Sequence, residues 1–425
     1  MVGQPAIASN PCLLPHVPFE NEVAGTVEVV TPAADRPSQD SPQQPSRTIR
    51  YGAIGTGMMG CEHLRNIAAL PGAVTVAYSD PSPSSLSWAA AALVDQPTAT
   101  AHNDHLDLLE RDDLDAVVIS SPNHTHVDVV RDVLTKRPDL NVLIEKPLCT
   151  TSADCAELIM LRDARPTGSG IVWVGLEYRY MPPAARFLAE IQRGTVGSLK
   201  MIAIREHRFP FLVKVDNWNR FSANTGGTLV EKCCHYFDLM NLAVGAKPVR
   251  VMASGGQDVN HLTEMYDTPS GPARSDILDN AFVIVDYANG VRCLLDLSMF
   301  AEGGPHEQEL VATGDAAKLE AFIPSGLLRI GRRGGPIGEG GRFTGAGIEE
   351  LDASHDPRIR FGGFHHGASY LEHADFCDAI RGSLPAKVTL EDGMWSVVVG
   401  EAAHRSIDQG NAVLINDLIS TRGGI

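Results

Sequence analysis

The sequence lacks long apolar runs and has a deficit of basic charge. No stretch approaches the ~20 consecutive apolar residues that a membrane-spanning helix requires, so we expect no membrane association. Lys and Arg total 35 against 52 Asp and Glu, which gives a net charge of −17. Nucleic acids and anionic membrane surfaces select the opposite balance. The composition therefore argues against both as partners.

The chain also lacks paired cysteine motifs and targeting signals. Its eight cysteines form no C-x-x-C pair and sit in apolar segments, which predicts buried, reduced thiols and a cytoplasmic protein. Residues 1–48 show neither the basic-then-apolar pattern of a secretory signal nor the Arg-rich pattern of a transit peptide. Eight of the 27 prolines fall there. We therefore expect residues 1–48 to be a flexible N-terminal extension.

A glycine motif follows this extension. The segment IRYGAIGTGMMG, residues 49–60, turns from an apolar run into a helical pattern through a G-x-G-x-x-G sequence. Such glycines permit a tight turn, a close approach to a pyrophosphate and close helix–strand packing. The motif alone is weak, because glycine serves any strained turn, but its strand–helix context supports a dinucleotide site. The expected cofactor contacts here are Gly55, Gly57, Met58, Met59 and Gly60.

An acidic residue follows the motif at the expected distance. The second predicted strand, residues 74–79, ends at Asp80, about 20 positions after the glycines. A carboxylate there suits a ribose 2′-hydroxyl and repels a 2′-phosphate. NAD is therefore favoured over NADP. The alternative is that Asp80 is the N-cap of a helix beginning near Ser84.

Strands and helices alternate as far as residue 175, which predicts an α/β Rossmann domain over residues 49–175 with a parallel sheet. The loops that follow its strands line the ligand crevice in such folds. Two of these loops carry polar side chains, SPNHTH after residues 115–120 and EKP after residues 141–144. The expected contacts with the cofactor are Ser121, Pro122, Asn123, His126, Glu145 and Lys146. Surface or capping histidines and an exposed Glu–Lys ion pair are the structural alternatives.

The pattern changes in residues 176–425, which predict an α+β domain. Strands are expected at residues 201–206, 249–253, 281–287, 291–297, 309–312 and 318–322, and Asn289-Gly290 is a strong hairpin signal. They predict a mostly antiparallel sheet, closed by helices at residues 368–380 and 391–409. The irregular stretch 209–227 is long enough to be functional, and the glycine-rich loop 331–347 is expected to be mobile.

A helix predicted at residues 226–242, GGTLVEKCCHYFDLMNL, places Glu231, His235 and Asp238 on one face. Three explanations stay open. The face is solvated or structural; or it binds zinc with a neighbouring cysteine, although adjacent helical residues point about 100° apart; or it performs acid/base chemistry. In the last case a neutral histidine removes a hydroxyl proton as hydride leaves.

Five motifs in order, GAIGTGMMG, SPNHTH, EKP, GLEYRY and GG-x-L-x-E-x-x-x-H-x-x-D-L, resemble the glucose-fructose oxidoreductase/inositol dehydrogenase (Gfo/Idh/MocA) family over residues 49–409. The resemblance implies a Rossmann domain and an open-faced sheet domain that often forms homodimers or homotetramers. It implies that Lys146 contacts the reacting hydroxyl and that Glu145 contacts the cofactor or orders the lysine. It also makes His235 the general base and places Arg179 near cofactor or substrate.

One position departs from the family, which commonly has Asp four residues before the histidine. This chain has Glu231, which we expect to orient His235 or to bind a sugar hydroxyl. Further expected substrate contacts are Trp218, Asn219 and His365. A core role for Trp218 is an equal alternative.

The resemblance implies an NAD(P)-dependent dehydrogenase that oxidises a secondary ring hydroxyl of a sugar, glycoside or cyclitol, or catalyses the reverse reduction, with no metal. Two other functions stay open. One is a glycoside lyase or hydrolase that keeps NAD bound and oxidises its substrate transiently. The other is a non-catalytic regulator that binds NAD or a sugar.

Overall fold

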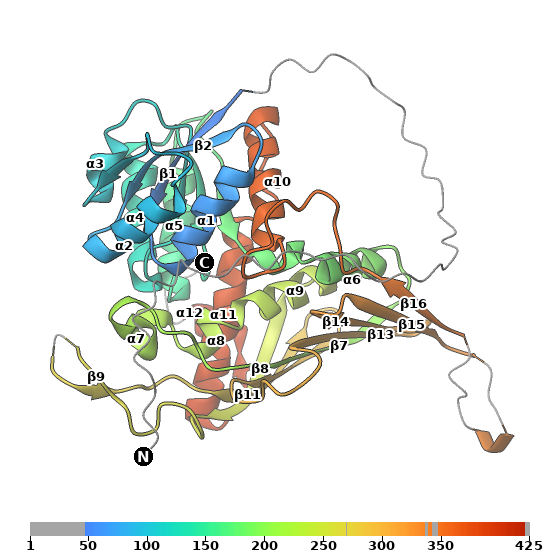
Figure 1. Ribbon diagram of the computed structural model, residues 1–425. Helices are drawn as coiled ribbons and strands as arrows, with labels where there is room; N and C mark the ends of the chain where they lie inside the picture. Colours follow the sequence, from blue (N-terminus) through green and yellow to red (C-terminus); the bar gives the residue numbers. More distant parts are fainter. Residues whose placement is uncertain (1–46, 269, 336–338, 342–346, 421–425) are drawn as a thin grey trace, which may run out of the picture.

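The computed structural model describes residues 47–268, 270–335, 339–341 and 347–420. The expected flexible extension lies almost entirely outside these residues, as do residues 336–338 and 342–346 of the expected mobile loop. Among the described helices, none combines the length and the apolarity that crossing a membrane would take. Figure 1 shows a helix-flanked sheet beside a longer second sheet.

The first sheet is parallel throughout, with strand order β3-β2-β1-β4-β5-β6. Its strands are β1 Ile49–Ile54, β2 Ala73–Ser79, β3 Thr100–His102, β4 Ala116–Ile119, β5 Asn141–Glu145 and β6 Val172–Gly175. The central strands β4 and β5 are apolar runs buried on both faces. The strand order reverses between β1 and β4, which is where open α/β sheets bind ligands. The predicted Rossmann fold is confirmed.

Helices connect these strands close to the predicted positions. They are α1 Met58–Ala69, α2 Pro83–Ala92, α3 His105–Leu109, α4 His126–Lys136 and α5 Ser152–Asp163, with a 3₁₀ turn η1 Asn123–Thr125 before α4. Ser82 caps α2 and Thr151 caps α5, so these two helices begin where a side-chain hydroxyl accepts a hydrogen bond from a free backbone N–H. Asp80 is therefore not the N-cap of α2.

The second sheet has nine strands in the order β16-β15-β14-β13-β7-β12-β11-β8-β17. Their bounds are β7 Leu199–His207, β8 Pro248–Gly256, β11 Asn280–Tyr287, β12 Arg292–Ser298, β13 Gln308–Gly314, β14 Ala317–Ile323, β15 Leu327–Arg332, β16 Ile348–Asp352 and β17 Val413–Leu414. Among the described strands of this second sheet, only the β7–β12 pair is parallel. The predicted mostly antiparallel sheet is confirmed, including the turn at Gly290, whose φ is +84°.

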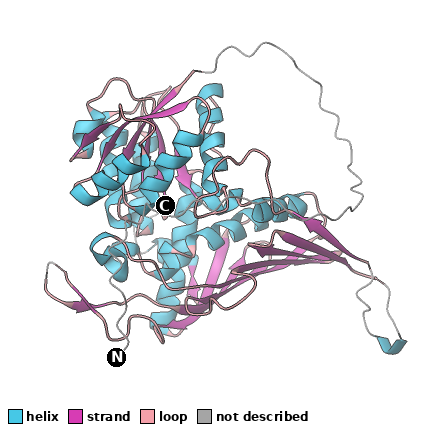
Figure 2. Ribbon diagram, in the orientation of Figure 1, coloured by secondary structure: helices cyan, strands magenta, loops and turns pink. Residues whose placement is uncertain are grey.

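Of the four longer helices described after β6, three contact the second sheet, namely α6 Pro182–Gln192, α9 Cys234–Val244 and α11 Leu390–Gln409, and the fourth, α10 Ala368–Gly382, packs beside the first sheet (Figure 2). α6 and α9 contact the second sheet, α10 contacts α1, and α11 contacts both α5 and β8. The two sheets are therefore joined by a shared helical layer, with large side chains such as Trp173, Tyr236 and Phe376 fully buried.

Smaller elements complete the chain. They are η2 Glu177–Tyr180, η3 Val215–Arg220, α7 Ser222–Thr225, α8 Thr228–Glu231, the β9 Met265–Tyr266 and β10 Ala273–Arg274 hairpin, η4 Glu339–Gly341 and α12 Ile415–Ser420. The helix predicted over residues 226–242 is interrupted. α8 ends at Glu231, a turn follows, and α9 begins at Cys234, so the regular spacing of its polar residues does not hold.

Candidate active site

The glycine motif forms the turn between β1 and α1, and each glycine meets a different constraint. Gly55 has φ +86°, and a Cβ there would lie 2.5 Å from the backbone nitrogen of Ser121. A Cβ on Gly60 would lie 2.2 Å from the carbonyl oxygen of Gly55. A Cβ on Gly57 would meet no protein atom within 4 Å. The turn is closed by backbone on two sides and open at Gly57, beside the half-exposed Met58 and Met59 that begin α1, as a pyrophosphate site requires.

Asp80 lies at the end of β2, beside this turn. Its Oδ2 accepts a hydrogen bond from the Thr56 backbone N–H at 2.8 Å, and its Oδ1 accepts one from Ser82 N–H at 2.8 Å. The carboxylate is therefore fixed next to the glycine turn.

The loop after β4 carries the predicted SPNHTH residues. His126 is fully buried, with Nδ1 2.9 Å from the Pro147 carbonyl oxygen and Nε2 3.0 Å from the Ser121 carbonyl oxygen. It thus joins the loops that follow β4 and β5. Ser121 and Pro122 are partly exposed, whereas Asn123 is buried with its Nδ2 unpaired among the described residues. Because both ring nitrogens of His126 lie against backbone carbonyl oxygens, its role in cofactor binding would be to position this loop.

Glu145 is the last residue of β5, and Lys146 follows it directly. Glu145 is buried, and its carboxylate accepts hydrogen bonds from the Lys146 backbone N–H at 3.0 Å and from Nε2 of His63 at 2.8 Å. His63 in turn lies 2.8 Å from His373 on α10. This buried chain of hydrogen bonds fixes the end of β5, directly before Lys146.

The side chain of Lys146 reaches the break between α8 and α9. Because α8 ends at Glu231, the carbonyl of that residue is available, and Lys146 Nζ donates to it at 3.2 Å. Burial lowers the pKa of Lys146, yet nearby acidic groups, Cys234 and Glu177 foremost, more than offset it and the net shift is upward. Lys146 therefore stays charged at neutral pH, within reach of the segment that carries His235.

His235 lies on the first turn of α9 and is 1% exposed. Its ring stacks on Tyr178, with centroids 3.8 Å apart and an interplanar angle of 8°. Burial, reinforced by the charges of Lys146 and Lys232, holds the pKa of His235 well below its usual value. The imidazole is therefore neutral at pH 7, which is the form that can accept a proton.

The carboxylate that faces His235 is not the expected one. Glu177 Oε1 lies 3.5 Å from His235 Nε2, in place of the predicted Glu231. The interruption of the helix explains the difference, because Glu231 and His235 no longer share one regular helical face. Glu177, two residues beyond the end of β6, was missed in the sequence, although Glu145 at the end of the neighbouring strand β5 was predicted to lie in the site.

Glu231 keeps a place in the site. It is 5% exposed, and its Oε2 has no hydrogen-bond partner within the described part of the chain. Burial raises its pKa, partly opposed by Lys146 and by Lys214. Lys214 comes from the long stretch 209–227 and was also missed; burial lowers its pKa. Glu231 and Lys214 therefore face the same charged cluster as Lys146.

Lys232 fills the space behind His235. It is 5% exposed, and its Nζ lies 2.6 Å from the Tyr178 hydroxyl and 3.0 Å from Glu206 Oε1. Burial lowers its pKa, and Glu206 opposes that shift. A second buried ion pair therefore lies under the aromatic ring on which His235 stacks.

Two predicted residues have other partners than expected. Arg179 donates from Nε to Asp238 Oδ2 at 2.6 Å and lies 3.3 Å from Asp392. Its guanidinium is thus engaged with α9 and α11 rather than free for cofactor or substrate. The same pair accounts for Asp238, whose place on the predicted polar face is structural.

Of the three further expected sugar contacts, Trp218, Asn219 and His365, two lie where they could line the site and one does not. Trp218 is half-buried and its ring lies 6.4 Å from that of His124, which joins η3 to the loop after β4. Asn219 is fully buried and donates to the Leu212 carbonyl at 3.0 Å. His365 Nδ1 lies 3.5 Å from Glu177 Oε1. Trp218 and His365 are therefore placed to line the site, while Asn219 supports the loop.

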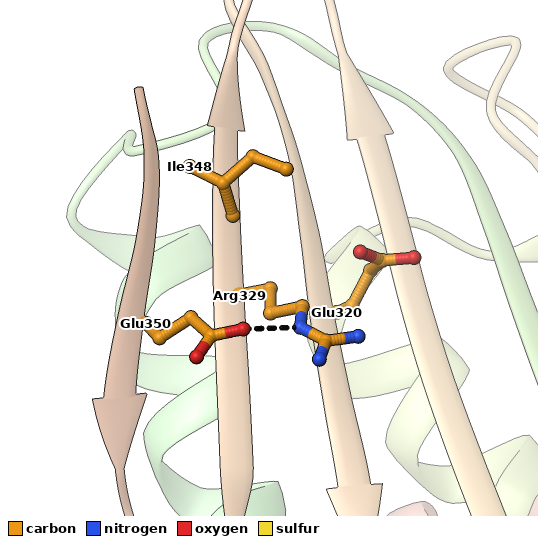
Figure 3. Close-up of a pocket in the computed structure, with 4 residues that line it drawn as sticks. All are labelled: Glu320, Arg329, Ile348 and Glu350. Carbon is orange, nitrogen blue, oxygen red and sulfur yellow. Dashed lines mark hydrogen bonds and ion pairs between the residues drawn. The ribbon is translucent and has the colours of Figure 1, made fainter. Parts of the chain in front are cut away.

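A shallow hollow lies away from the crevice, on strands at one end of the second sheet. Figure 3 shows its four lining residues, Glu320, Arg329, Ile348 and Glu350, with Arg329 paired to Glu350 at 2.7 Å. Its one cation is already paired, so the hollow offers no reactive group comparable to those around Lys146.

Comparison with known proteins agrees with this geometry. Residues 49–172 match the family described as "Oxidoreductase family, NAD-binding Rossmann fold", and residues 189–415 match "Oxidoreductase family, C-terminal alpha/beta domain". Inositol 2-dehydrogenase 2 of Saccharopolyspora erythraea is 28% identical over 369 residues, 86% of this chain and 94% of that protein. Myo-inositol 2-dehydrogenase of Thermotoga maritima is 24% identical, over 87% of this chain and 100% of that protein.

The fold of solved structures points the same way. The structure of levoglucosan dehydrogenase with NADH and levoglucosan has a TM-score of 0.71 at 18% identity, over 86% of this chain and 99% of that one. The two family matches together cover most of residues 49–415. The chain therefore belongs to the Gfo/Idh/MocA oxidoreductase family, and its first sheet and helices form that family's NAD-binding domain.

Proposed function

We propose that this protein is an NAD-dependent dehydrogenase that oxidises a secondary ring hydroxyl of a cyclitol, sugar or glycoside, or runs the reverse reduction. The observation that carries the proposal is the hydrogen bond from Lys146 Nζ to the Glu231 carbonyl. It brings the lysine that follows β5 to the segment that carries the neutral, buried His235. Inositol is the first substrate to test, because the related proteins above are named inositol dehydrogenases.

The residues divide the chemistry between them. Lys146, charged at neutral pH, polarises the substrate oxygen and stabilises it as its proton leaves. His235 takes that proton during oxidation and returns it during reduction. Glu231, with one unpaired buried oxygen, accepts a hydrogen bond from a substrate hydroxyl, and Trp218 and His365 border the ring. The nicotinamide, when bound, supplies the hydride acceptor.

The glycine turn supports the cofactor assignment. Its open side at Gly57 and the fixed carboxylate of Asp80 suit a pyrophosphate and an unphosphorylated ribose. The half-exposed Ser121 and Pro122 would border the same cofactor. We propose functional units at residues 49–175 and 176–425, with the site where they meet.

The test is the absorbance of NADH formed by the purified protein with NAD, and separately with NADP, against inositols, monosaccharides and glycosides. NADH formed from one group of substrates supports the proposal and assigns the group. Loss of a glycoside without net NADH would replace it with a lyase or hydrolase that recycles its cofactor. Binding of NAD with no turnover of any compound would leave a regulator as the explanation.

We also propose that a second copy of the chain covers the outer face of the second sheet. Met252, Ile284 and Leu294 lie in one row across β8, β11 and β12 and are 56%, 45% and 36% exposed, and Phe282 beside them is 60% exposed. A contiguous apolar row of this kind is typical of an interface between subunits. In Figure 1, α6 and α9 lie on the side of the second sheet that faces the first sheet, so the outer face is the side that these helices do not cover.

The size of the protein in solution tests this proposal. Light scattering should give a dimer or tetramer for the wild type, and Ile284→Lys should reduce it to smaller species with the fold intact by circular dichroism. Met160→Lys, at a position of α5 that is 66% exposed and lies outside the second sheet, is the control and should leave the size unchanged. A wild-type monomer would overturn the proposal.

We place the protein in the cytoplasm. The seven described cysteines are buried and none of them forms a disulfide bond with another, which suits a reducing compartment. Imaging of a fluorescent fusion in the native host would test this placement.

A further inference from the structure

Glu177 is a buried carboxyl that the proposed chemistry leaves unused. It is 1% exposed, and neither of its oxygens makes a hydrogen bond within the described part of the chain. Burial, with the charge of Glu145, raises its pKa to about 8. An unsatisfied buried carboxyl is destabilising, so its presence calls for a functional reason.

Its position between two imidazoles supplies that reason. Glu177 Oε1 lies 3.5 Å from His235 Nε2 and 3.5 Å from His365 Nδ1. His235 is 1% exposed at its side chain, whereas His365 is 19% exposed. His235, Glu177 and His365 therefore lie in that order from the buried base toward solvent. A slight rotation of a side chain would bring either nitrogen within hydrogen-bond distance of the carboxyl oxygen.

We propose that Glu177 relays protons between His235 and solvent through His365, so that the general base is reset after each turnover. The inference rests on the proposed dehydrogenase function and deepens it. During oxidation the substrate proton goes to the His235 imidazole. The O–H bond of Glu177 then breaks as its proton passes to His365 Nδ1, and a new O–H bond forms with the proton from His235 Nε2. Water takes the proton from His365, and Glu177 returns to its starting state.

The surroundings make His365 a transient carrier: burial and the charge of Lys232 lower its pKa to about 3, so a proton that it receives passes on to water at once. Charged or titratable groups from every neighbouring element face the relay: Glu62 on α1, Glu145 and Lys146 at the end of β5, Arg208 after β7, Lys232 and Cys234 at the α8–α9 break, and Glu372 on α10. A proton held on Glu177 lies between positive and negative neighbours. Both protonation states of the carboxyl are therefore accessible near neutral pH, as a relay requires.

Glu177→Gln is the decisive variant, because it keeps the shape of the side chain and removes its acid function. We expect the first turnover, seen as a rapid burst of NADH, to keep its rate within about twofold, since His235 can still take one proton. Steady-state kcat should fall about 10²-fold, KM should change little, and the D₂O effect on kcat should rise. Wild-type steady-state turnover would overturn the relay, and so would equal losses in burst and steady state.

Glu372→Gln is the matched control. Glu372 is also a buried carboxyl whose pKa is raised by burial and by Glu177, but it has no described contact with either imidazole. We expect its burst and its steady-state rate to change together if they change at all. A burst followed by slow turnover in this variant as well would overturn the assignment to Glu177.

A second readout separates this inference from the proposed function. In protein labelled with ¹³C at the glutamate carboxyls, one resonance should titrate near pH 8, vanish in Glu177→Gln and remain in Glu372→Gln. Its midpoint should move in His365→Gln. If no compound is oxidised, the proposed function fails while this titration still decides whether Glu177 and His365 share a proton. An unmoved midpoint would overturn the relay.

Discussion

The proposed site has two ends of different construction: a phosphate end, formed by residues 55–60 with Asp80, and a hydroxyl end, formed by Lys146, Glu177, Glu231 and His235. At the phosphate end, six consecutive residues shape a turn in which backbone touches backbone so closely that a Cβ on Gly60 would lie 2.2 Å from the Gly55 carbonyl oxygen. At the hydroxyl end, buried side chains converge from the loops after β5 and β6 and from the α8–α9 break. The first end is local in sequence and depends on shape. The second depends on long-range packing and on charge.

This difference determines which kind of substitution, a change of shape or a change of charge, each end tolerates. A turn made of backbone fails when any atom is added where backbone closes it, whatever the charge of that atom. A cluster of buried charges keeps its shape through isosteric changes but loses its protonation states. Substitutions at the phosphate end should therefore lower stability or the affinity for NAD. Substitutions at the hydroxyl end should lower the catalytic rate.

The largest effect should come from the phosphate end. Gly60→Ala puts a Cβ against the Gly55 carbonyl and should lower the free energy of unfolding by more than about 2 kcal/mol. Gly57→Ala, where the Cβ meets no protein atom within 4 Å, should change that energy by less than about 0.5 kcal/mol and still lose NAD affinity about tenfold. Urea unfolding and NAD titration measure both. Equal stability losses in the two variants would contradict the account of the turn.

The hydroxyl end should show the opposite pattern. His235→Asn removes the base, and kcat should fall by about 10²- to 10⁴-fold while NADH binding, followed by fluorescence, stays within about twofold. His207→Asn is the control, because His207 on β7 pairs with Asp296 outside the site. Unchanged kcat in His235→Asn would show that another group takes the proton.

The same difference decides what the sequence could reveal. The turn, Asp80 and the strands around them were predicted because each depends on neighbours along the chain. The Gly290 hairpin was predicted for the same reason. The two-part architecture followed from the change in pattern near residue 175.

The hydroxyl end was predicted only in part. Lys146 and His235 were assigned through the resemblance to the family, and the structure brings their segments together. Glu177, Lys214 and Lys232 were missed, because their roles depend on the interruption at Lys232–Cys233 and on which side chains meet across elements. Helical periodicity assumed an unbroken helix, and for that reason it paired His235 with Glu231 and gave Asp238 a place in the site.

A smaller effect should follow at the ribose side of the phosphate end. Thr56 N–H and Ser82 N–H donate to different oxygens of Asp80, so Asp80→Asn keeps an acceptor for only one of them, and it removes the charge that repels a 2′-phosphate. We expect the ratio of kcat/KM for NADP to that for NAD to rise about tenfold, which is ~1.4 kcal/mol. Losing one of the two hydrogen bonds to backbone should lower the free energy of unfolding by about 1 kcal/mol without changing the fold seen by circular dichroism. An unchanged ratio would mean that Asp80 only supports the turn.

The smallest effect, and the sharpest for the hydroxyl end, should come from Lys232. The groups that set the charge around His235 are Lys146, Lys232, His365, Arg208 and Glu177. Lys232→Met removes one positive charge while Arg208, 3.6 Å from Glu206, still balances that carboxylate. With less positive charge nearby, the pKa of His235 should rise.

Because His235 acts as a base only when neutral, the acid limb of the kcat/KM profile should move to higher pH in Lys232→Met, by about one unit. The rate at the plateau should change little. Lys200→Met, at an exposed position of β7, is the control and should leave the limb in place. A limb that stays put in Lys232→Met would mean that burial alone keeps His235 neutral, and that the hydroxyl end, like the phosphate end, depends on shape rather than charge.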